Sequence, residues 1–259
     1  MTRPAADDFS GLLEAAAPAD PRPRPPERGR LLARVAASAA AARVHTTRRR
    51  ADLAPLPLAR GVAARVLYEA TGTARRAGEP ECVRLVELAP GAAWPGPAPT
   101  WRREWLLLQG DARIGAAALA PLDFRLDPAG AAAGPVASER GALLYLRESA
   151  GAAGEGPACS AEAAEAWHDF APGIRRRVLW SAGGESALLY RARPGAAVPG
   201  HRHGHDEECL MIEGDVFLDD VLLRAGDWQL APAGSGHAGV ATDTGGLLYA
   251  HGDLELDLR

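Results

Sequence analysis

The sequence has little of several residue types, and each shortage excludes a class of protein. Only three cysteines occur in 259 residues, at positions 82, 159 and 209, so neither a disulfide framework nor a paired-cysteine zinc site can form. This sparse content fits a reducing compartment, and we expect a cytoplasmic protein. No apolar run approaches the roughly 18 residues of a membrane span. Asp7 and Asp8 also stand where a signal peptide would be apolar, so we expect no membrane partner.

Lysine is absent, so all 29 basic residues are arginine, and 33 acids give a net charge of −4. Proteins that bind nucleic acid directly need a concentrated basic face, which argues against that function. One local exception is the stretch 22–50, where nine arginines stand against a single acid, Glu27. Two interpretations stay open for it: a solvated tail, or an interaction tail for a regulatory protein partner with an acidic surface.

Aromatic residues make up only 5% of the chain, while 29 glycines and 21 prolines punctuate short apolar runs. This pattern favours short strands joined by tight turns, and therefore an all-β antiparallel sandwich or barrel. We predict strands at 83–88, 105–108, 142–146, 187–192, 209–212, 216–218 and 246–251. The one expected helix spans 26–42, where Pro26 stands at the start and Leu31, Leu32 and Val35 have helical spacing.

An internal repeat is the most informative feature of the chain. The segment 90–96, PGAAWPG, matches 194–200, PGAAVPG, at an offset of 104 residues. The same offset pairs a framework of Glu, Gly, Asp, Pro and Tyr residues over about sixty positions, including Glu104 with Glu208 and Tyr145 with Tyr249. We therefore predict a short tail at 1–50, helical or disordered, a first barrel at 51–149, a linker at 150–166 and a second barrel at 167–259.

Histidine and glutamate cluster in the second repeat. His201 and His203 stand two residues apart, and on a strand such residues point to the same face. Glu207 follows four residues later, and His237 arrives from a separate predicted hairpin. Three imidazoles and one carboxylate suit first-row divalent metals, so we predict one metal ion on His201, His203, Glu207 and His237. The first repeat has Pro97, Pro99, Arg103 and Ala133 at these positions and is predicted to bind no metal.

The second repeat resembles the cupin family. Residues 195–214 fill every position of the first cupin motif, G(X)5HXH(X)3–4E(X)6G, through Gly195, His201, His203, Glu207 and Gly214. Residues 226–237 resemble the second motif, although Ala241 replaces its final Asn. The resemblance implies two tandem cupin barrels, of the double-stranded β-helix or jelly-roll type, which we expect to pair with each other as cupin dimers do. A homodimer of the whole chain stays open as well.

Four neighbours of the predicted ligands have alternative roles. Glu208 could replace Glu207, but only Glu207 has the motif spacing to Gly214, and Glu208 matches Glu104 of the repeat without ligands. His205 continues the alternation and could be a further ligand, although we favour a loop or supporting position. Cys209 and Met211 share strand parity with Glu207, so we expect them to line the barrel interior as packing residues.

The order of the segments resembles the ChrR-like cupins, whose namesake is an anti-sigma factor with a zinc-binding helical domain before its cupin. The resemblance rests on PPERGRLLARV (25–35), PLARGVAARVL (57–67) and HRHGHDEECLMIEGDVFLDD (201–220). Residues 1–50, with one His and no Cys, do not match that zinc domain, so the chain is expected to be a bicupin without it.

Two functions follow from the resemblance. The first is a regulatory sensor linked to transcription, in which the metal site detects an oxidant or small ligand. The second is a metal-dependent dioxygenase acting on a small chelating substrate such as a β-diketone or catechol-like compound. Zinc would favour the sensor and iron(II) the enzyme, with manganese and nickel as further options. A general acid or base would have to come from neighbouring groups such as His205 or His251, and the sequence identifies no catalytic residue among them.

Overall fold

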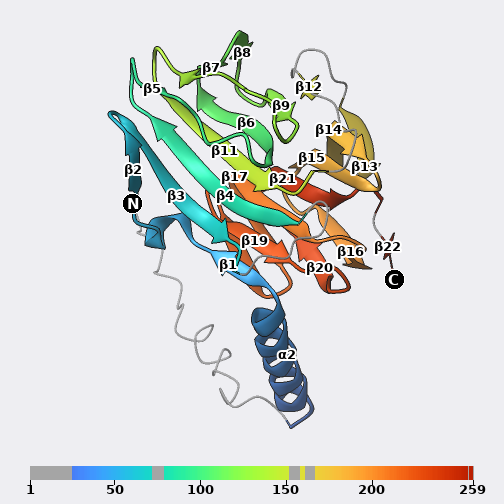
Figure 1. Cartoon of the computed structure of the whole chain (residues 1–259). Helices are drawn as coiled ribbons and strands as arrows, with labels where there is room; N and C mark the ends of the chain where they lie inside the picture. The colour runs from blue at the N-terminus through green and yellow to red at the C-terminus, as the bar shows by residue number, and fades with distance from the viewer. Residues whose placement is uncertain (1–24, 72–78, 152–157, 161–166, 256, 259) are drawn as a thin grey trace, which may run out of the picture. The chain divides into compact units, whose positions relative to one another are not determined.

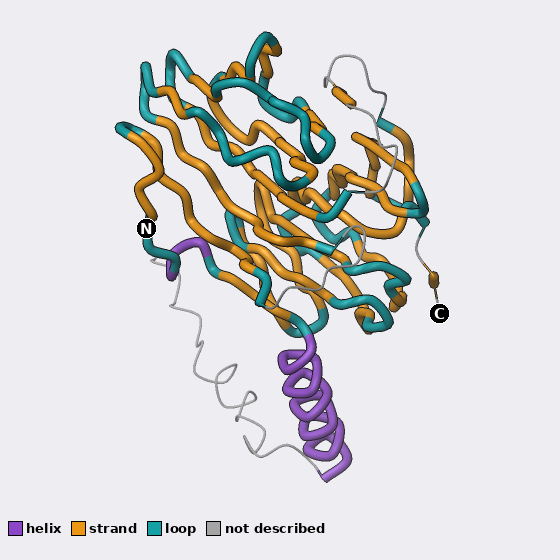
Figure 2. Tube along the Cα trace, in the orientation of Figure 1, coloured by secondary structure: helices purple, strands orange, loops and turns teal. Residues whose placement is uncertain are grey.

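The computed structural model describes residues 25–71, 79–151, 158–160, 167–255 and 257–258. Strands dominate these residues (Figures 1 and 2), which confirms the expected all-β class. The described regular structure otherwise consists of helix α2 (Pro25–Val44) and a 3-10 turn, η1 (Arg50–Asp52). No helix among these residues is both long and apolar enough to cross a membrane.

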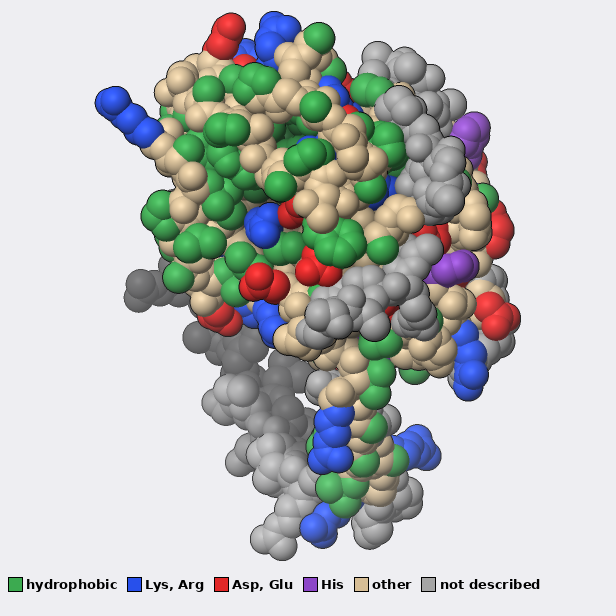
Figure 3. Space-filling view, in the orientation of Figure 1, with side chains coloured by type: hydrophobic (Ala, Val, Ile, Leu, Met, Phe, Trp, Pro, Cys, Tyr) green, Lys and Arg blue, Asp and Glu red, His purple; other side chains and the backbone are tan. Residues whose placement is uncertain are grey.

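Helix α2 is slightly longer than the predicted 26–42. Proline is tolerated in a first helical turn, where no backbone N–H partner is needed, and Pro25 and Pro26 occupy that turn here. The apolar side chains Leu31, Leu32 and Val35 are exposed. Arginine side chains also project from the helix (blue in Figure 3). The helix therefore presents both apolar and basic groups to its surroundings.

The first barrel consists of two antiparallel sheets. The larger sheet has the order β12-β9-β6-β11-β4-β3-β2, and the smaller has the order β5-β10-β7-β8. The strands are β2 (Leu56–Ala59), β3 (Val62–Glu69), β4 (Pro80–Leu88), β5 (Ala93–Trp94), β6 (Arg102–Gly110), β7 (Ala112–Ile114), β8 (Ala117–Leu119), β9 (Phe124–Asp127), β10 (Val136–Ala137), β11 (Ala142–Ser149) and β12 (Ala158–Ser160). Strand β12 lies within the segment 150–166 that the sequence suggested as a linker.

The second barrel has the path β13-β14-β15-β21-β17-β20-β16-β22, with β18 and β19 paired to β17. Its strands are β13 (His168–Ala171), β14 (Ile174–Ala182), β15 (Glu185–Ala192), β16 (Ala197–Arg202), β17 (Glu207–Leu218), β18 (Val221–Arg224), β19 (Trp228–Ala231), β20 (Gly236–Ala241), β21 (Gly246–Asp253) and β22 (Asp257–Leu258). Strand β17 runs through both segments 209–212 and 216–218, which had been predicted as separate strands.

The 104-residue repeat is visible in the backbone. Gly110 and Gly214 both adopt a positive φ, 83° and 77°, at the end or middle of equivalent strands β6 and β17. A Cβ atom at either position would lie 1.8 or 2.1 Å from the carbonyl oxygen of Gly141 or Gly245, respectively. No larger residue fits such a contact, which explains why glycine stands at this position in both barrels.

A short strand from outside each barrel extends the sheet of the other. Strand β1 (Thr46–Arg48) precedes the first barrel but pairs with β19 of the second, with Thr46 opposite Leu230. Strand β12 precedes the second barrel but pairs with β9 of the first, with Ala158 opposite Leu126. Because Leu126 and Leu230 are themselves 104 residues apart, the two pairings are equivalent. The segment predicted as a tail thus contributes a strand to the second barrel.

Three apolar clusters stabilise the structure. The largest draws on both barrels and lies between them; it includes Leu67, Leu85, Leu106, Leu189, Leu210 and Trp228. A second cluster fills the first barrel, and a smaller third one occupies the second barrel. Burying one such side chain contributes about 1.5–3 kcal/mol. The barrels therefore share a core while each retains an interior of its own.

A buried polar network joins the barrels with approximate two-fold symmetry. The Tyr145 hydroxyl donates to Glu208 at 2.9 Å, and the Tyr249 hydroxyl donates to Glu104 at 3.2 Å. Arg147 bridges both carboxylates, at 3.0 Å from Glu104 and 2.6 Å from Glu208. Although burial opposes ionisation, the charges of His251, Arg147 and Arg102 hold the pKa of Glu104 well below its usual range. Each repeat therefore supplies a tyrosine to the other repeat's glutamate.

Candidate metal centre

Strands β16 and β20 bring three histidines together. His201 on β16 lies directly opposite His237 on β20, and His203 follows β16 by one residue. The ring centroids are 5.1 Å apart for His201 and His203, 5.1 Å for His203 and His237, and 5.6 Å for His201 and His237. All three residues are buried. The register between β16 and β20 therefore places His237 beside His201, a proximity that the sequence spacing alone could not establish.

Glu207 completes the group from the first position of β17. Its Oε2 atom lies 3.1 Å from Nδ1 of His203. Potential ligand atoms of His201, His203 and Glu207 all lie within 4.8 Å of one another. Three of the four predicted residues thus form one compact donor group, and His237 joins it through ring contacts with both histidines.

The second nitrogen of two histidine rings is held by an acceptor. Nδ1 of His201 donates to the carbonyl oxygen of Pro199 at 3.1 Å, and Nδ1 of His237 donates to Oδ2 of Asp219 at 3.3 Å. An acceptor at Nδ1 fixes the tautomer, so Nε2 keeps a free lone pair. The Nε2 atoms of His203 and His237 are buried without a hydrogen-bond partner among the described residues. Such a donor set fits a divalent metal ion.

Asp219 is the residue that orients His237, and its backbone is strained. It adopts a positive φ of 55°, which L-residues rarely adopt. Its Oδ1 atom accepts the backbone N–H of Ala238 at 2.5 Å and that of Gly239 at 3.3 Å. Its other oxygen accepts His237, so both oxygens are engaged. Sequence reasoning missed this residue because nothing in the motif spacing marks a supporting carboxylate.

The charges of the group are interdependent. Although burial favours the neutral ring, the Glu207 carboxylate raises the pKa of His203. Burial works against the Glu207 anion as well, yet the neighbouring histidines, His203 above all, lower its pKa. For His237, burial dominates and lowers the pKa. The group thus favours a charged Glu207 and a neutral His237, which are the protonation states that bind a cation, while the proton that Glu207 favours on His203 would have to leave when a metal binds.

An apolar pocket opens beside the group, inside the second barrel. Glu207 and His201 form part of its wall together with Cys209 and Met211, as their strand parity predicted. Apolar side chains such as Val198, Leu218 and Leu248 complete much of the lining. Burial raises the pKa of the Cys209 thiol well above its usual range, so the thiol stays protonated. The pocket can therefore hold a small ligand against the histidine and glutamate side chains.

The alternative candidates lie elsewhere. Glu208 points away from the histidines into the network between the barrels, where Tyr145 and Arg147 bind it. His251 lies in the same network, 3.4 Å from Glu104. His205 pairs with Asp253 at 2.5 Å and is 40% exposed in its side chain. None of these three joins the group formed by His201, His203 and Glu207.

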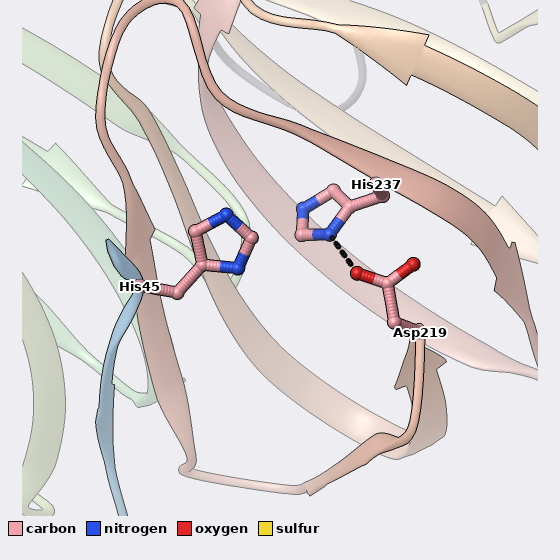
Figure 4. A group of neighbouring side chains, drawn as sticks. All are labelled: His45, Asp219 and His237. Atoms are coloured by element: carbon pink, nitrogen blue, oxygen red, sulfur yellow. Dashed lines mark hydrogen bonds and ion pairs between the residues drawn. The ribbon is translucent and has the colours of Figure 1, made fainter. Parts of the chain in front are cut away.

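A fourth imidazole reaches the group from the N-terminal segment. His45 lies immediately before β1, and its ring centroid is 5.1 Å from that of His237. Figure 4 shows the two rings side by side, with the Asp219 carboxylate bonded to His237. Burial lowers the pKa of His45 and favours its neutral ring. Sequence reasoning counted this histidine but gave it no role, because 156 residues separate it from His201.

Residues 156–256 match the ChrR Cupin-like domain. The carboxyl-terminal barrel belongs to the ChrR-like cupin family. None of the curated protein sequences compared with the chain matches it significantly.

Several solved structures share the tandem fold. A "putative dioxygenase" from Nostoc punctiforme superposes with a TM-score of 0.65 at 15% identity, covering 84% of each chain. A variant of Bacillus subtilis oxalate decarboxylase has a TM-score of 0.62 at 16% identity, covering 82% of this chain and 78% of that one. Another structure of that decarboxylase, with a TM-score of 0.59 at 14% identity, covers 83% and 78% and concerns its Mn(II) centres. At these identities the likeness establishes the bicupin fold.

Proposed function

We propose that this ChrR-like bicupin is a regulatory sensor that holds one divalent metal ion on His201, His203, Glu207 and His237. The observation that carries the proposal is the buried histidine group: Nδ1 of His201 and of His237 each donate to an acceptor, and the buried Nε2 atoms of His203 and His237 lack a partner among the described residues. A metal bound there would supply a Lewis acid for an oxygen-donor ligand or an oxidant in the pocket. Zinc or iron(II) suits these ligands, and manganese and nickel do so as well.

The pocket favours ligand binding over proton-transfer catalysis. Burial raises the pKa of both Cys209 and Tyr190, so neither exchanges a proton readily near neutral pH. Asp215 accepts a hydrogen bond from Thr242 at 3.3 Å. The candidate acid–base residues His205 and His251 are paired outside the group. These placements support a sensor, whose ligand changes the centre without being converted.

Helix α2 is the element that we propose to contact the regulatory partner. It exposes Leu31, Leu32 and Val35 together with arginine side chains, a combination suited to an acidic protein surface with apolar patches. The helix leads directly into His45, so the partner-binding segment and the metal centre are adjacent in the chain.

Metal content after replacement of two histidines tests the site. The double variant His201→Ala, His203→Ala, purified without an affinity tag, is expected to lose stoichiometric metal, because two of the four ligands are gone. His168→Ala, an exposed histidine of the same barrel, serves as the matched control and should keep wild-type content. Full metal retention by the double variant would refute the site.

Oxygen consumption separates the sensor from the alternative enzyme. The solved bicupins described above include a "putative dioxygenase", which favours that alternative. Iron(II)-loaded protein mixed with β-diketone or catechol-like compounds is expected to consume no oxygen beyond the His201→Ala, His203→Ala background. Turnover at ordinary enzymatic rates, on the order of 1 per second or faster, would replace the sensor with a dioxygenase.

A further inference from the structure

The segment 45–53, which we call the N-terminal strap, is fixed to the second barrel at several points. Its strand β1 pairs with β19, and Gln229 donates to the Thr47 hydroxyl at 3.0 Å. Arg49 forms an ion pair with Asp227 at 2.7 Å and also donates to the Leu222 carbonyl. These contacts hold the strap in place, so the position of His45 at its start is set by the barrel.

The His45 ring has the spacing of a member of the histidine group. Its centroid lies 5.1 Å from that of His237, the same as the separation between His201 and His203. Potential ligand atoms of His45, Asp219 and His237 lie within 4.8 Å of one another. A nitrogen donor from the strap therefore reaches the edge of the site.

Asp219 does not make a separate metal site with His45. Both of its oxygens already accept hydrogen bonds, one from the backbone of Ala238 and Gly239 and the other from His237. Because Nδ1 of His237 donates to Asp219, the free Nε2 atom on the other side of the His237 ring points away from the carboxylate. The carboxylate thus acts as a support, and His45 is better assigned to the same centre as His237.

The internal repeat gives an independent argument. Because β1 and β12 occupy equivalent registers, the residue before β12 corresponds to His45, and that residue is Pro157. In the first repeat Pro97, Pro99, Arg103 and Ala133 replace the four predicted ligands. The barrel that lacks those ligands therefore has no histidine at this position either.

We propose that His45 is a further ligand of this metal centre, supplied by the N-terminal strap. The inference rests on the proposed metal site and adds a residue outside both cupin motifs. Because His45 directly follows helix α2 in the sequence, metal binding would add a further attachment of the strap to the second barrel, next to the helix. Occupancy of the centre would thereby regulate how firmly the proposed partner-binding helix is tethered.

Metal affinity and cobalt spectroscopy test this role on the full-length protein. Metal-free wild type, His45→Ala and His45→Gln are titrated with Co(II) in competition with a chelator. Both variants are expected to bind one ion with roughly 10- to 100-fold lower affinity and with an altered visible spectrum. His168→Ala, the exposed control, should match the wild type in both measurements.

Three results would overturn the inference. Wild-type affinity and an unchanged Co(II) spectrum in both His45 variants would show that the ring does not touch the metal. Binding of two ions by the wild type and one by His45→Ala would assign His45 to a second site. Absence of metal binding by the wild type would instead refute the proposed function itself, and this inference with it.

Tryptic cleavage reports on the strap directly. Arg43 and Arg48 flank His45, so cleavage after them measures how firmly the strap is held. Metal is expected to slow this cleavage severalfold in the wild type and not in His45→Ala, while circular dichroism of the metal-free proteins stays equal. Equal protection by metal in both proteins would contradict the proposed tether, even if the affinities differ.

Discussion

The two barrels share one backbone plan but fill their interiors differently. In the first, Trp105 and Leu107 lie in a dense apolar cluster with Trp94, Ile114 and Leu146. In the second, the equivalent positions of β17 hold Cys209 and Met211, which line a pocket. The large Trp105 side chain fills the space that the smaller Cys209 side chain leaves open in the second barrel. The same backbone plan therefore accommodates either a packed or a hollow interior at these strand positions.

The same contrast appears at a strained turn. Gly115 of the first barrel has a φ of 57°, and Asp219, its equivalent in the second, has a φ of 55°. Glycine adopts this conformation without cost, whereas an L-residue costs about 1–2 kcal/mol. The second barrel accepts that strain where its carboxylate orients His237, whose counterpart is Ala133. At this turn the strain occurs in the barrel that has a site to support, whereas Leu122 of the first barrel, with a φ of 69°, stands where the second barrel has Gly226.

Trp105→Ala should have the largest effect on stability. Its indole is fully buried, packs against Trp94 and donates to Asp127 at 3.0 Å. Removal leaves a cavity in a packed interior, so the free energy of unfolding is expected to fall by about 3–5 kcal/mol, measured by urea denaturation. Metal binding by the second barrel should persist under native conditions.

Cys209→Ala is the matched variant in the second barrel. The thiol already borders an open pocket, so its loss should lower the free energy of unfolding by only about 1 kcal/mol. Losses of similar size in Trp105→Ala and Cys209→Ala would contradict the contrast between a packed and a hollow interior.

Glu104→Gln tests the network between the barrels. Ion pairs and hydrogen bonds from Arg102, Arg147 and Tyr249 reach Glu104, so the variant should lose about 2–3 kcal/mol of unfolding free energy at neutral pH. Burial alone would raise the folded-state pKa of Glu104, but the charges of His251, Arg147 and Arg102 outweigh it and lower that pKa. The stabilisation is therefore present above the unfolded pKa of about 4.3 and is lost as pH falls towards the folded pKa.

The pH profile distinguishes this effect from simple repacking. Urea midpoints measured from pH 7 down to pH 3 should fall less steeply for Glu104→Gln than for the wild type. Glu208→Gln, the equivalent variant in the second barrel, removes the bonds from Tyr145 and Arg147 and should cost less. Identical pH profiles for Glu104→Gln and the wild type would show that the Glu104 carboxylate contributes nothing to acid stability.

The fold could be predicted from the sequence because the residues that specify it recur at regular intervals along the chain. Gly110 and Gly214 recur at a fixed offset because each allows a turn that no side chain fits, and codon composition alone cannot imitate that pattern. Alternation along β17 likewise predicted that Cys209 and Met211 lie on the same face as Glu207, and the structure has all three in the wall of one pocket. These features follow from local backbone geometry, which a single sequence records.

Contacts between distant segments could not be predicted in the same way. The exchange of β1 and β12 between barrels depends on how the barrels pack, and neither strand is longer than three residues. His45 and Asp219 reach His237 through that packing and through one turn, without a motif. The register of β1 against β19 decides the position of His45, and only the folded chain fixes that register.

Asp219→Gly tests the strained turn and would make the second barrel resemble the first there. The variant removes the acceptor that holds Nδ1 of His237, so the ring loses its fixed tautomer and orientation. Metal affinity, measured by competition with a chelator, is expected to fall roughly 10- to 100-fold, while binding stoichiometry stays at one. Asp243→Gly, which changes an exposed carboxylate, should leave affinity unchanged. Unaltered affinity in Asp219→Gly would mean that the strained turn serves the fold alone, and the second difference between the barrels would then be unrelated to the metal centre.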